Sequence, residues 1–266
     1  MDHTPRVLHT ERIAKTDAQP AKWLLFTHGI YGAGMNWRGI ARKIHERRPD
    51  WGIVLVDLRQ HGKSGPGAPP HTIAACAEDL REVIDAADIP IVALAGHSFG
   101  GKVVMATKLL VEPEQTWILD ASPSPRAGAI DDTNYSVTNV LVLMERLPKT
   151  WPKRDDFVQA IVDAGHAPSL ANWLAMNLVS TDAGYVNRLD LAAIREMLTD
   201  YWAQDLWRAI DSRVEYVIAA RSASVSPSDR AHLATTGAHV HTIDAAHWLH
   251  IEAPDQVVDL FATRLP

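Results

Sequence analysis

The stretch that decides the fold is Ile91-Val92-Ala93-Leu94-Ala95-Gly96-His97-Ser98-Phe99-Gly100-Gly101. Its first five residues form a continuous apolar run, as in a β-strand that is covered on both faces. Gly96, Ser98 and Gly100 then form the pattern G-x-S-x-G, and a helix is predicted to follow. In such a strand–turn–helix the serine lies at the apex of a strained turn, where side chains at the flanking glycines would collide with the neighbouring chain. The sequence therefore predicts that Ser98 is a nucleophile rather than an incidental serine in a glycine-rich turn.

The composition is that of a globular protein and argues against several other classes. Of the 266 residues, 47% are hydrophobic and 22% are charged, so the chain can bury a sizeable core. A formal net charge of −6 argues against nucleic-acid binding, which requires a basic face. No apolar run approaches the roughly 18 residues needed to cross a bilayer, and the first residues do not follow the plan of a signal peptide.

Cys76 is the only cysteine, so no internal disulfide can form, which is typical of the reducing cytosol. It lies in a helical pattern among Ile73, Ala74 and Leu80. We interpret it as a buried apolar residue rather than a nucleophile. The cysteine content and the lack of a signal peptide together predict a cytoplasmic protein.

Strands alternate with helices on both sides of the opening stretch. The predicted strands cover residues 6–13, 22–27, 52–56, 91–95, 115–119, 214–220 and 239–243. This alternation, with apolar strand cores, predicts an α/β fold with a doubly wound, mostly parallel sheet. Ligands of such sheets bind outside the carboxyl ends of the strands. Four reactive side chains fall at predicted strand ends, namely His28, Asp57, Ser98 and Asp120.

The alternation stops over residues 125–209, where we predict no strand. Helices are predicted there over residues 138–147, 154–164, 169–178, 190–200 and 204–210. We interpret the segment as a helical cap that is inserted after the sixth strand. The core domain would then comprise residues 1–124 and 210–266. Trp151, Trp173 and Trp202 either fill a core of the cap itself or form an apolar roof over the site.

A serine hydroxyl is a poor nucleophile unless a base takes its proton. His247 fits this role because it follows the last predicted strand on a short Asp-Ala-Ala loop, and His250 is its rival. His239 and His241 alternate on one strand and could suggest a metal pair. Since no third ligand is near them in the sequence, we interpret them as surface histidines and predict no metal site.

The third member of a triad is an acid that orients the histidine. The commonest place for it is just after the strand at 214–220, but no carboxylate occurs there before Asp229, which falls inside a predicted helix. Asp120 directly follows the strand at 115–119 and is the favoured acid. Asp229, or a site without an acid, stays open as an alternative. Asp120 could otherwise be a turn residue before Pro123.

An oxyanion hole needs two N–H groups that point at one oxygen. We predict the backbone N–H groups of Phe99, at the start of a helix, and of Ile30, in the loop after the strand at 22–27. His28 is expected to brace that loop by hydrogen bonds rather than to take part in the chemistry. The same interpretation applies to Asp57, Arg59 and His61 in the neighbouring loop.

Four motifs carry a resemblance to a known family. They are His28-Gly29, Asp57-Leu58-Arg59-Gln60-His61-Gly62-Lys63-Ser64, Gly96-His97-Ser98-Phe99-Gly100-Gly101-Lys102 and Ala246-His247-Trp248. Together they resemble the α/β-hydrolase superfamily, over residues 24–120 and 214–266. The Asp-x-Arg-x-His-Gly block, Lys102 and an Asp120 that is soon followed by Ser-Pro are similar to the small, capped esterase–thioesterase branch of bacteria and mitochondria. The resemblance implies that the acid comes from the strand after the elbow helix, as Asp120 does. Phe99 departs from the methionine usual at its position, and residues 221–226 lack the usual glycines.

These residues predict a serine hydrolase of carboxylic esters or thioesters. Ser98 would attack the carbonyl, His247 would take its proton and Asp120 would hold His247. No cofactor is needed, and a serine at position 98 excludes the related enzymes that use an aspartate nucleophile. Hydrolysis of C–C bonds, cofactor-free perhydrolysis and ligand binding without turnover stay open on the same residues.

The substrate is predicted to be a small, mostly apolar ester or thioester. The candidate pocket residues are His28, Trp151, Trp173, Trp202 and Trp248. We expect no nucleic-acid partner and no membrane span, and either a monomer or a homodimer.

Overall fold

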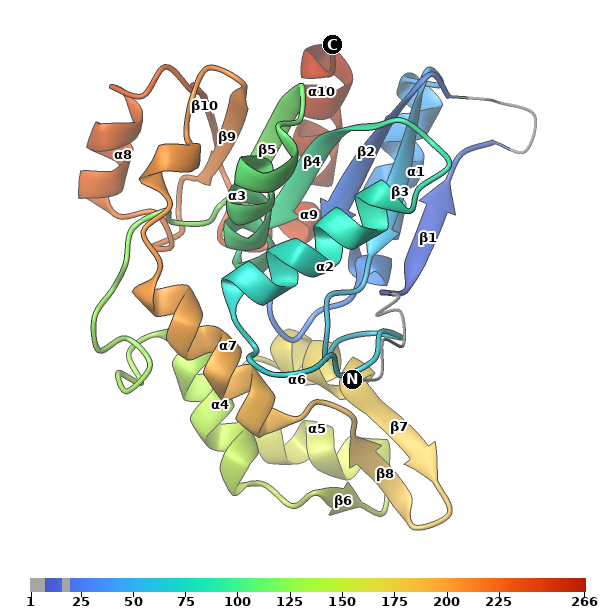
Figure 1. Ribbon diagram of the computed structural model, residues 1–266. Helices are drawn as coiled ribbons and strands as arrows, with labels where there is room; N and C mark the ends of the chain where they lie inside the picture. The colour runs from blue at the N-terminus through green and yellow to red at the C-terminus, as the bar shows by residue number, and fades with distance from the viewer. Residues whose placement is uncertain (1–7, 16–19) are drawn as a thin grey trace.

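A seven-stranded sheet forms the centre of the computed structural model, which describes residues 8–15 and 20–266 (Figure 1). The strand order is β1-β3-β2-β4-β5-β9-β10. Strand β1 pairs antiparallel with β3, and all other neighbours are parallel. The strands are β1 (Thr10–Ile13), β2 (Lys22–Thr27), β3 (Trp51–Val56), β4 (Ile91–His97), β5 (Gln115–Leu119), β9 (Val214–Ala219) and β10 (His239–Ile243). The predicted doubly wound, mostly parallel sheet is confirmed, although residues 6 and 7 of the first predicted strand lie outside the described residues.

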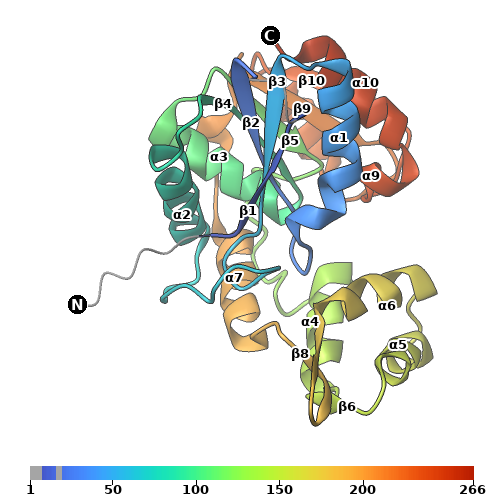
Figure 2. The ribbon, with the colours of Figure 1, turned by 90° about the vertical axis from the view of Figure 1, so that its right-hand side faces the viewer.

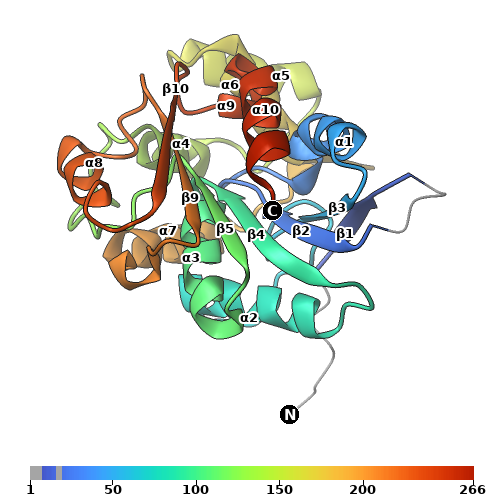
Figure 3. The same ribbon diagram turned by 90° about the horizontal axis from the view of Figure 1, so that it is seen from above.

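Different helices cover the two faces of the sheet (Figure 3). One face carries η1 (Gly34–Trp37), α1 (Arg38–Arg47), α9 (Leu249–Glu252) and α10 (Pro254–Arg264), and the other carries α2 (Ile73–Asp85), α3 (Phe99–Val111) and α8 (Pro227–Leu233). Alternate residues of β2 show the division, because Leu24 and Phe26 belong to one apolar cluster while Trp23 and Leu25 belong to the other. Burial on both faces explains why these strands appear in the sequence as unbroken apolar runs.

Residues 125–209 lie beyond the carboxyl ends of the parallel strands, below the sheet in Figure 1 (Figures 1 and 2). Their elements are α4 (Ser136–Arg146), β6 (Thr150–Trp151), α5 (Arg154–Asp163), α6 (Pro168–Leu174), η2 (Ala175–Asn177), β7 (Leu178–Thr181), β8 (Gly184–Asn187), α7 (Leu191–Ala203) and η3 (Trp207–Ala209). We call this segment the cap. The segment follows β5, the fifth strand of the described chain, and not the predicted sixth. The sequence carries only five strand-like runs before residue 125, and each of them makes one strand.

The prediction that the cap contains no strand is wrong. Strands β6, β8 and β7 form an antiparallel sheet in that order. Asp182 and Ala183 join β7 to β8, and Gly184 has a φ of +114°, which favours glycine. A Cβ at Gly184 would lie 2.4 Å from the carbonyl oxygen of Trp151 on β6. In place of the helix predicted over 169–178, α6 ends at Leu174, η2 ends at Asn177 and the hairpin begins at Leu178. Val179, Tyr185 and Val186 are residue types that favour strands.

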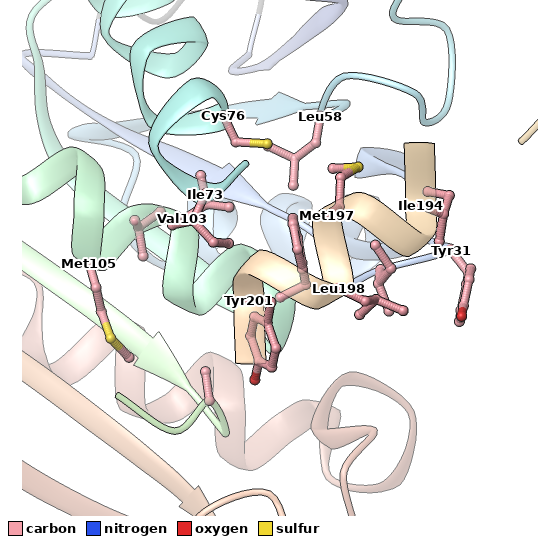
Figure 4. Close-up of a cluster of buried hydrophobic side chains, with 14 of the residues drawn as sticks. Tyr31, Leu58, Ile73, Cys76, Val103, Met105, Ile194, Met197, Leu198 and Tyr201 are labelled. Atoms are coloured by element: carbon pink, nitrogen blue, oxygen red, sulfur yellow. The ribbon is translucent and has the colours of Figure 1, made fainter. Parts of the chain in front are cut away.

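Helix α7 joins the cap to the sheet. Its Met197, Leu198 and Tyr201 side chains belong to the same apolar cluster as residues of α2 and α3 (Figure 4). Cys76 is fully buried in this cluster, as predicted, and burial raises the pKa of its thiol to about 12. None of the helices in the described part of the chain is both long and apolar enough to cross a membrane.

Candidate active site

Ser98 lies at the turn between β4 and α3, with φ +54° and ψ −119°. A positive φ is strained for a serine and persists only where the surroundings impose it. Here they do, because a Cβ at Gly96 would lie 2.2 Å from the carbonyl oxygen of Gly100, and a Cβ at Gly100 would lie 2.4 Å from that of His28. The predicted collisions at both flanking glycines are therefore present. The turn leaves the Ser98 side chain only partly buried.

His247 and Asp120 meet at the carboxyl ends of the strands. Nδ1–H of His247 donates to Oδ2 of Asp120 over 2.7 Å. The Asp120 side chain is fully buried, whereas that of His247 is 33% exposed. The second carboxylate oxygen, Oδ1, accepts the backbone N–H of Ala219 at 3.2 Å, so both oxygens of the buried group have a donor. The bond at Nδ1 leaves Nε2 as the nitrogen that can accept a proton.

His97 connects the elbow to the histidine loop. Its Nε2–H donates to the backbone oxygen of His247 over 2.8 Å, and the two rings lie 4.6 Å apart between centroids. Burial lowers the pKa of His97 well below its usual value, so the ring is neutral and carries a single N–H. The hydroxyl of Ser98 itself makes no hydrogen bond within the described ranges. His247 is thus held beside the elbow through the residue that precedes the serine.

The alternative acid, Asp229, faces another part of the molecule. Its Oδ2 accepts from the hydroxyl of Ser122 at 2.8 Å, and its Oδ1 accepts from that of Ser124 at 2.6 Å. It also accepts the backbone N–H of Ser226 at the start of α8. Burial alone would raise the pKa of Asp229, but these hydrogen bonds hold it below its usual value. Asp229 therefore secures the segment that leads into the cap and does not meet His247.

Ser224 is a neighbour of His247 that sequence reasoning missed. Its Oγ lies 2.9 Å from Nδ1 of His247, and the hydroxyl of Ser222 donates to the same Oγ at 3.0 Å. Residues 221–226 contain no carboxylate but carry three serines, and the hydroxyl of one of them reaches His247. The position was a sufficient signal, because the loop after β9 is where an acid commonly approaches this histidine.

The other late histidines lie away from Asp120. The ring of His250 stacks 4.4 Å from that of Trp37, and burial lowers the pKa of His250 to about 4. His241 donates from Nε2 to Glu215 at 2.5 Å across β9 and β10, and His239 is exposed on the same strand. In the described part of the chain, neither His250 nor the pair at 239 and 241 makes a hydrogen bond to Asp120.

Both predicted oxyanion donors lie on segments that touch Ser98. Within the described ranges, the backbone N–H groups of Ile30 and Phe99 donate to no protein acceptor. Phe99 begins α3, where the first N–H groups of a helix have no partner within it. A Cβ at Gly29, the neighbour of Ile30, would lie 3.3 Å from Cβ of Ser98. Two unsatisfied donors therefore flank the serine.

Two buried histidines brace the loops around these donors. Nε2 of His28 accepts the backbone N–H of Leu58 at 3.1 Å, and Nε2 of His61 accepts that of Tyr31 at 3.1 Å. Each Nδ1–H donates to a carbonyl of its own loop. Burial lowers the pKa of both rings, that of His61 to about 3, so both stay neutral. His28 is 1% exposed, which fits the predicted brace and not a lining of the substrate pocket.

Asp57 and Arg59 act in the same way. The two carboxylate oxygens of Asp57 accept the backbone N–H groups of Gly34 and Lys63, each at 2.7 Å. Arg59 forms a buried two-pronged ion pair with Asp79 on α2, at 2.6 and 2.8 Å. The loop after β3 is therefore tied to the loop after β2 and to α2.

The predicted pocket tryptophans divide into two groups. Trp173 on α6 packs against Trp248, which directly follows His247, with 4.9 Å between ring centroids. Trp151 packs edge-on against a phenylalanine of α5, and Trp202 packs against two tyrosines. Only Trp173 and Trp248 lie together beside the histidine, while Trp151 and Trp202 serve the packing of the cap.

Sequence comparison places these features in a family. A family model described as "Alpha/beta hydrolase family" matches residues 24–260. The chain is 27% identical over 261 residues to a Danio rerio protein named "sn-1-specific diacylglycerol lipase ABHD11", which covers 94% of this chain and 80% of that protein. It is 26% identical over 246 residues to a "Putative esterase/lipase" of Haemophilus influenzae. That match covers 88% of this chain and 80% of the Haemophilus protein.

Solved structures show the same fold. A structure named "Marine microorganism esterase" matches with a TM-score of 0.81 at 21% identity and covers 95% of this chain and 97% of that one. A second, named "Crystal Structure of E-2-(Acetamidomethylene)succinate Hydrolase", matches with a TM-score of 0.72 at 16% identity. It covers 97% of this chain and 99% of that one. At these identities the likeness concerns the fold alone.

Proposed function

The chain belongs to the α/β-hydrolase family and is a hydrolase, and on this premise we propose that it cleaves carboxylic esters or thioesters through an acyl-enzyme on Ser98. One observation carries the proposal: His247 hydrogen-bonds the buried Asp120 beside a serine held at positive φ. A carboxylate in this position keeps the imidazole in the tautomer that accepts a proton at Nε2. The contact of Trp173 with Trp248 supports a small, mostly apolar substrate.

Acylation begins when Oγ of Ser98 attacks the carbonyl carbon and His247 takes its proton. The carbonyl oxygen becomes an oxyanion that accepts the N–H groups of Ile30 and Phe99. Asp120 stabilises the imidazolium that has formed. His247 then gives its proton to the departing alcohol or thiol, the bond to the carbonyl carbon breaks, and the acyl group stays on Ser98.

Deacylation repeats these steps with water as the nucleophile. His247 removes a proton from water as the oxygen attacks the acyl carbon, and the same two N–H groups stabilise the second oxyanion. The proton then returns to Oγ of Ser98 as the acid departs. No redox step or cofactor enters this cycle.

A fluorophosphonate probe tests the nucleophile, because it phosphonylates an activated serine with loss of fluoride. We expect intact-mass measurement to find one adduct on the wild-type chain and none on Ser98→Ala. Ser228→Ala, at an exposed serine, is the matched control and should label like the wild type. A wild-type chain that does not label, or a Ser98→Ala chain that labels equally fast, would contradict the proposal.

The same experiment separates the alternatives that the sequence left open. A binding protein without turnover would not label at Ser98. A C–C bond hydrolase would label but would hydrolyse p-nitrophenyl and thioester substrates more slowly than its C–C substrate. A cofactor-free perhydrolase would label and would convert the acyl-enzyme to a peracid when hydrogen peroxide is added. Rates on an acyl-length series of both substrate types therefore complete the test.

A further inference from the structure

A cleft of about 290 Å³ lies between the cap and the loop that follows β2. On the sheet side it is lined by Tyr31, Met35 and Lys63, among others, and on the cap side by Met176 and Arg188. The mechanism proposed above uses none of these side chains. The cleft is therefore a candidate for recognition of a part of the substrate that does not react.

The cleft begins next to the proposed reaction centre at two points. Tyr31 follows Ile30, whose N–H is one of the proposed oxyanion donors, and adjacent Cα atoms are about 3.8 Å apart. Trp173 also lines the cleft and packs against Trp248, the neighbour of His247. Neighbours of two members of the proposed site, Tyr31 and Trp173, therefore line the cleft, which makes it the candidate site for a distant part of the substrate.

The charges of the cleft are unequally compensated. Both oxygens of Asp57 accept backbone N–H groups at 2.7 Å, and Glu11 accepts two N–H groups of Arg38 at 3.0 and 2.6 Å. Lys63 and Arg188, in contrast, form no ion pair with any carboxylate in the part of the chain that the structure describes. Two exposed cations thus line the cleft without a carboxylate partner among residues 8–15 and 20–266, on a chain whose net charge is −6.

The cleft also has an apolar wall. Met35 and Met176 are among the most exposed large hydrophobic residues, at 52% and 44%. The side-chain amide of Asn36 contacts the Met176 sulfur at 3.8 Å, so the two walls meet across the cleft. Methionine side chains adapt to ligands of varied shape. A ligand that contacts both the methionines and the two cations therefore carries an apolar part and a negative charge.

We propose that this cleft binds the negatively charged end of the substrate, a carboxylate or a phosphate, through Lys63 and Arg188. The inference rests on the proposed ester or thioester hydrolysis and adds the substrate class. An overall acidic protein repels anions, whereas the two cations that line this cleft attract them locally. Because both side chains are exposed, the attraction is modest and falls with added salt.

Hydrolysis of three esters tests the inference: p-nitrophenyl butyrate, mono-p-nitrophenyl glutarate and p-carboxyphenyl butyrate. The first is neutral, and the others carry a carboxylate on the acyl side and on the alcohol side. We expect Lys63→Gln and Arg188→Gln to raise KM about three- to tenfold for at least one charged ester. KM for the neutral ester should stay within about twofold. The side that responds identifies which product carries the charge.

Lys149→Gln and Arg208→Gln are the matched controls, because both residues are exposed and neither lines the cleft. They should leave all three KM values unchanged. Competition by glutarate and by inorganic phosphate then distinguishes a carboxylate from a phosphate ligand. If both cleft variants change the charged and neutral esters alike, or change neither, the inference is wrong while the proposed hydrolysis stands.

Calorimetric titration keeps the inference separate from the reaction. If no ester is hydrolysed and Ser98 does not label, the proposed function fails. Binding of glutarate and of inorganic phosphate then tests by itself whether the cleft is an anion site. Saturable binding that is lost in both cleft variants and kept in both controls supports it. No binding at millimolar anion, or equal binding by all variants, overturns it.

Discussion

The sheet and the cap contribute to the site by different kinds of interaction. On the sheet side, hydrogen bonds of buried groups position the proposed reacting residues: Asp120 binds the imidazole of His247, and His97 binds its backbone. On the cap side the contact is apolar, between Trp173 and Trp248. Hydrogen bonds fix distances and angles, whereas apolar packing tolerates substitution. We therefore expect substitutions on the sheet side to change kcat and substitutions in the cap to change KM.

Removal of the charge of Asp120 should have the largest effect. Asp120→Asn keeps the shape but favours the wrong tautomer of His247, so we expect kcat for a p-nitrophenyl ester to fall by about 10⁴. Asp229→Asn is the matched control at the alternative acid, and its kcat should change far less. Equal kcat values of Asp120→Asn and the wild type would rule Asp120 out as the acid.

Loss of the donor on His97 should have an intermediate effect. His97→Phe removes the hydrogen bond to the His247 backbone, and a displaced base costs about 10- to 100-fold in kcat. His97→Gln can still donate and should recover much of the loss, with little change in KM. If the two variants are equally impaired, packing rather than the hydrogen bond explains the effect.

Trp173→Ala tests whether the apolar contact on the cap side affects substrate binding rather than kcat. Loss of the ring should raise KM about three- to tenfold for long apolar acyl groups and leave kcat nearly unchanged. Trp151→Ala, within the cap core, is the contrasting variant and should lower thermal stability instead. A fall in kcat without a rise in KM for Trp173→Ala would contradict the division of roles between sheet and cap.

The last prediction concerns the attachment of the cap and is measured as stability rather than as activity. Nζ of buried Lys102 donates to the carbonyl oxygens of Ser124 and Tyr201 at 3.0 and 2.7 Å, and burial lowers its pKa to about 7. In the unfolded chain a lysine titrates near about 10.4, so between these values the unfolded state binds more protons. This residue should therefore make the free energy of unfolding rise with pH from about 7 to about 10.

Urea denaturation across that pH range measures the contribution of Lys102. Lys102→Met keeps most of the side-chain volume and should give a flatter dependence of the unfolding free energy on pH. Lys149→Met, at an exposed lysine, should leave the slope of the wild type unchanged. Parallel slopes for Lys102→Met and the wild type would show that Lys102 is not the titrating group.

The sheet was predictable because its signals are local. Each central strand is an apolar run, and the G-x-S-x-G pattern is read within five residues, although a Cβ at Gly96 would meet Gly100 while one at Gly100 would meet His28 of the loop after β2. The partner of His247 was harder to identify, because Asp120 lies 127 residues away and meets it only through the order of β5, β9 and β10. Ser224 was overlooked because the path of its loop, rather than its residue type, brings the hydroxyl to the imidazole.

The cap hairpin was missed for a different reason. Strands β7 and β8 have four residues each. β7 is largely exposed and β8 is half-buried, so neither has the apolar run that identifies the central strands. Their third partner is the two-residue strand β6, about thirty residues earlier in the chain. Such short strands depend on pairing that no local pattern records.

The two buried histidine braces have a consequence for inheritance. His28 satisfies a backbone N–H of the loop that carries His61, and His61 satisfies one of the loop that carries His28. Replacement of either one leaves an N–H of the opposite loop without an acceptor and loosens the loop on which the remaining histidine depends. We therefore expect selection to act on the two positions as one unit. Among relatives, we expect the two histidines to be kept together or exchanged together, although they lie thirty-three positions apart.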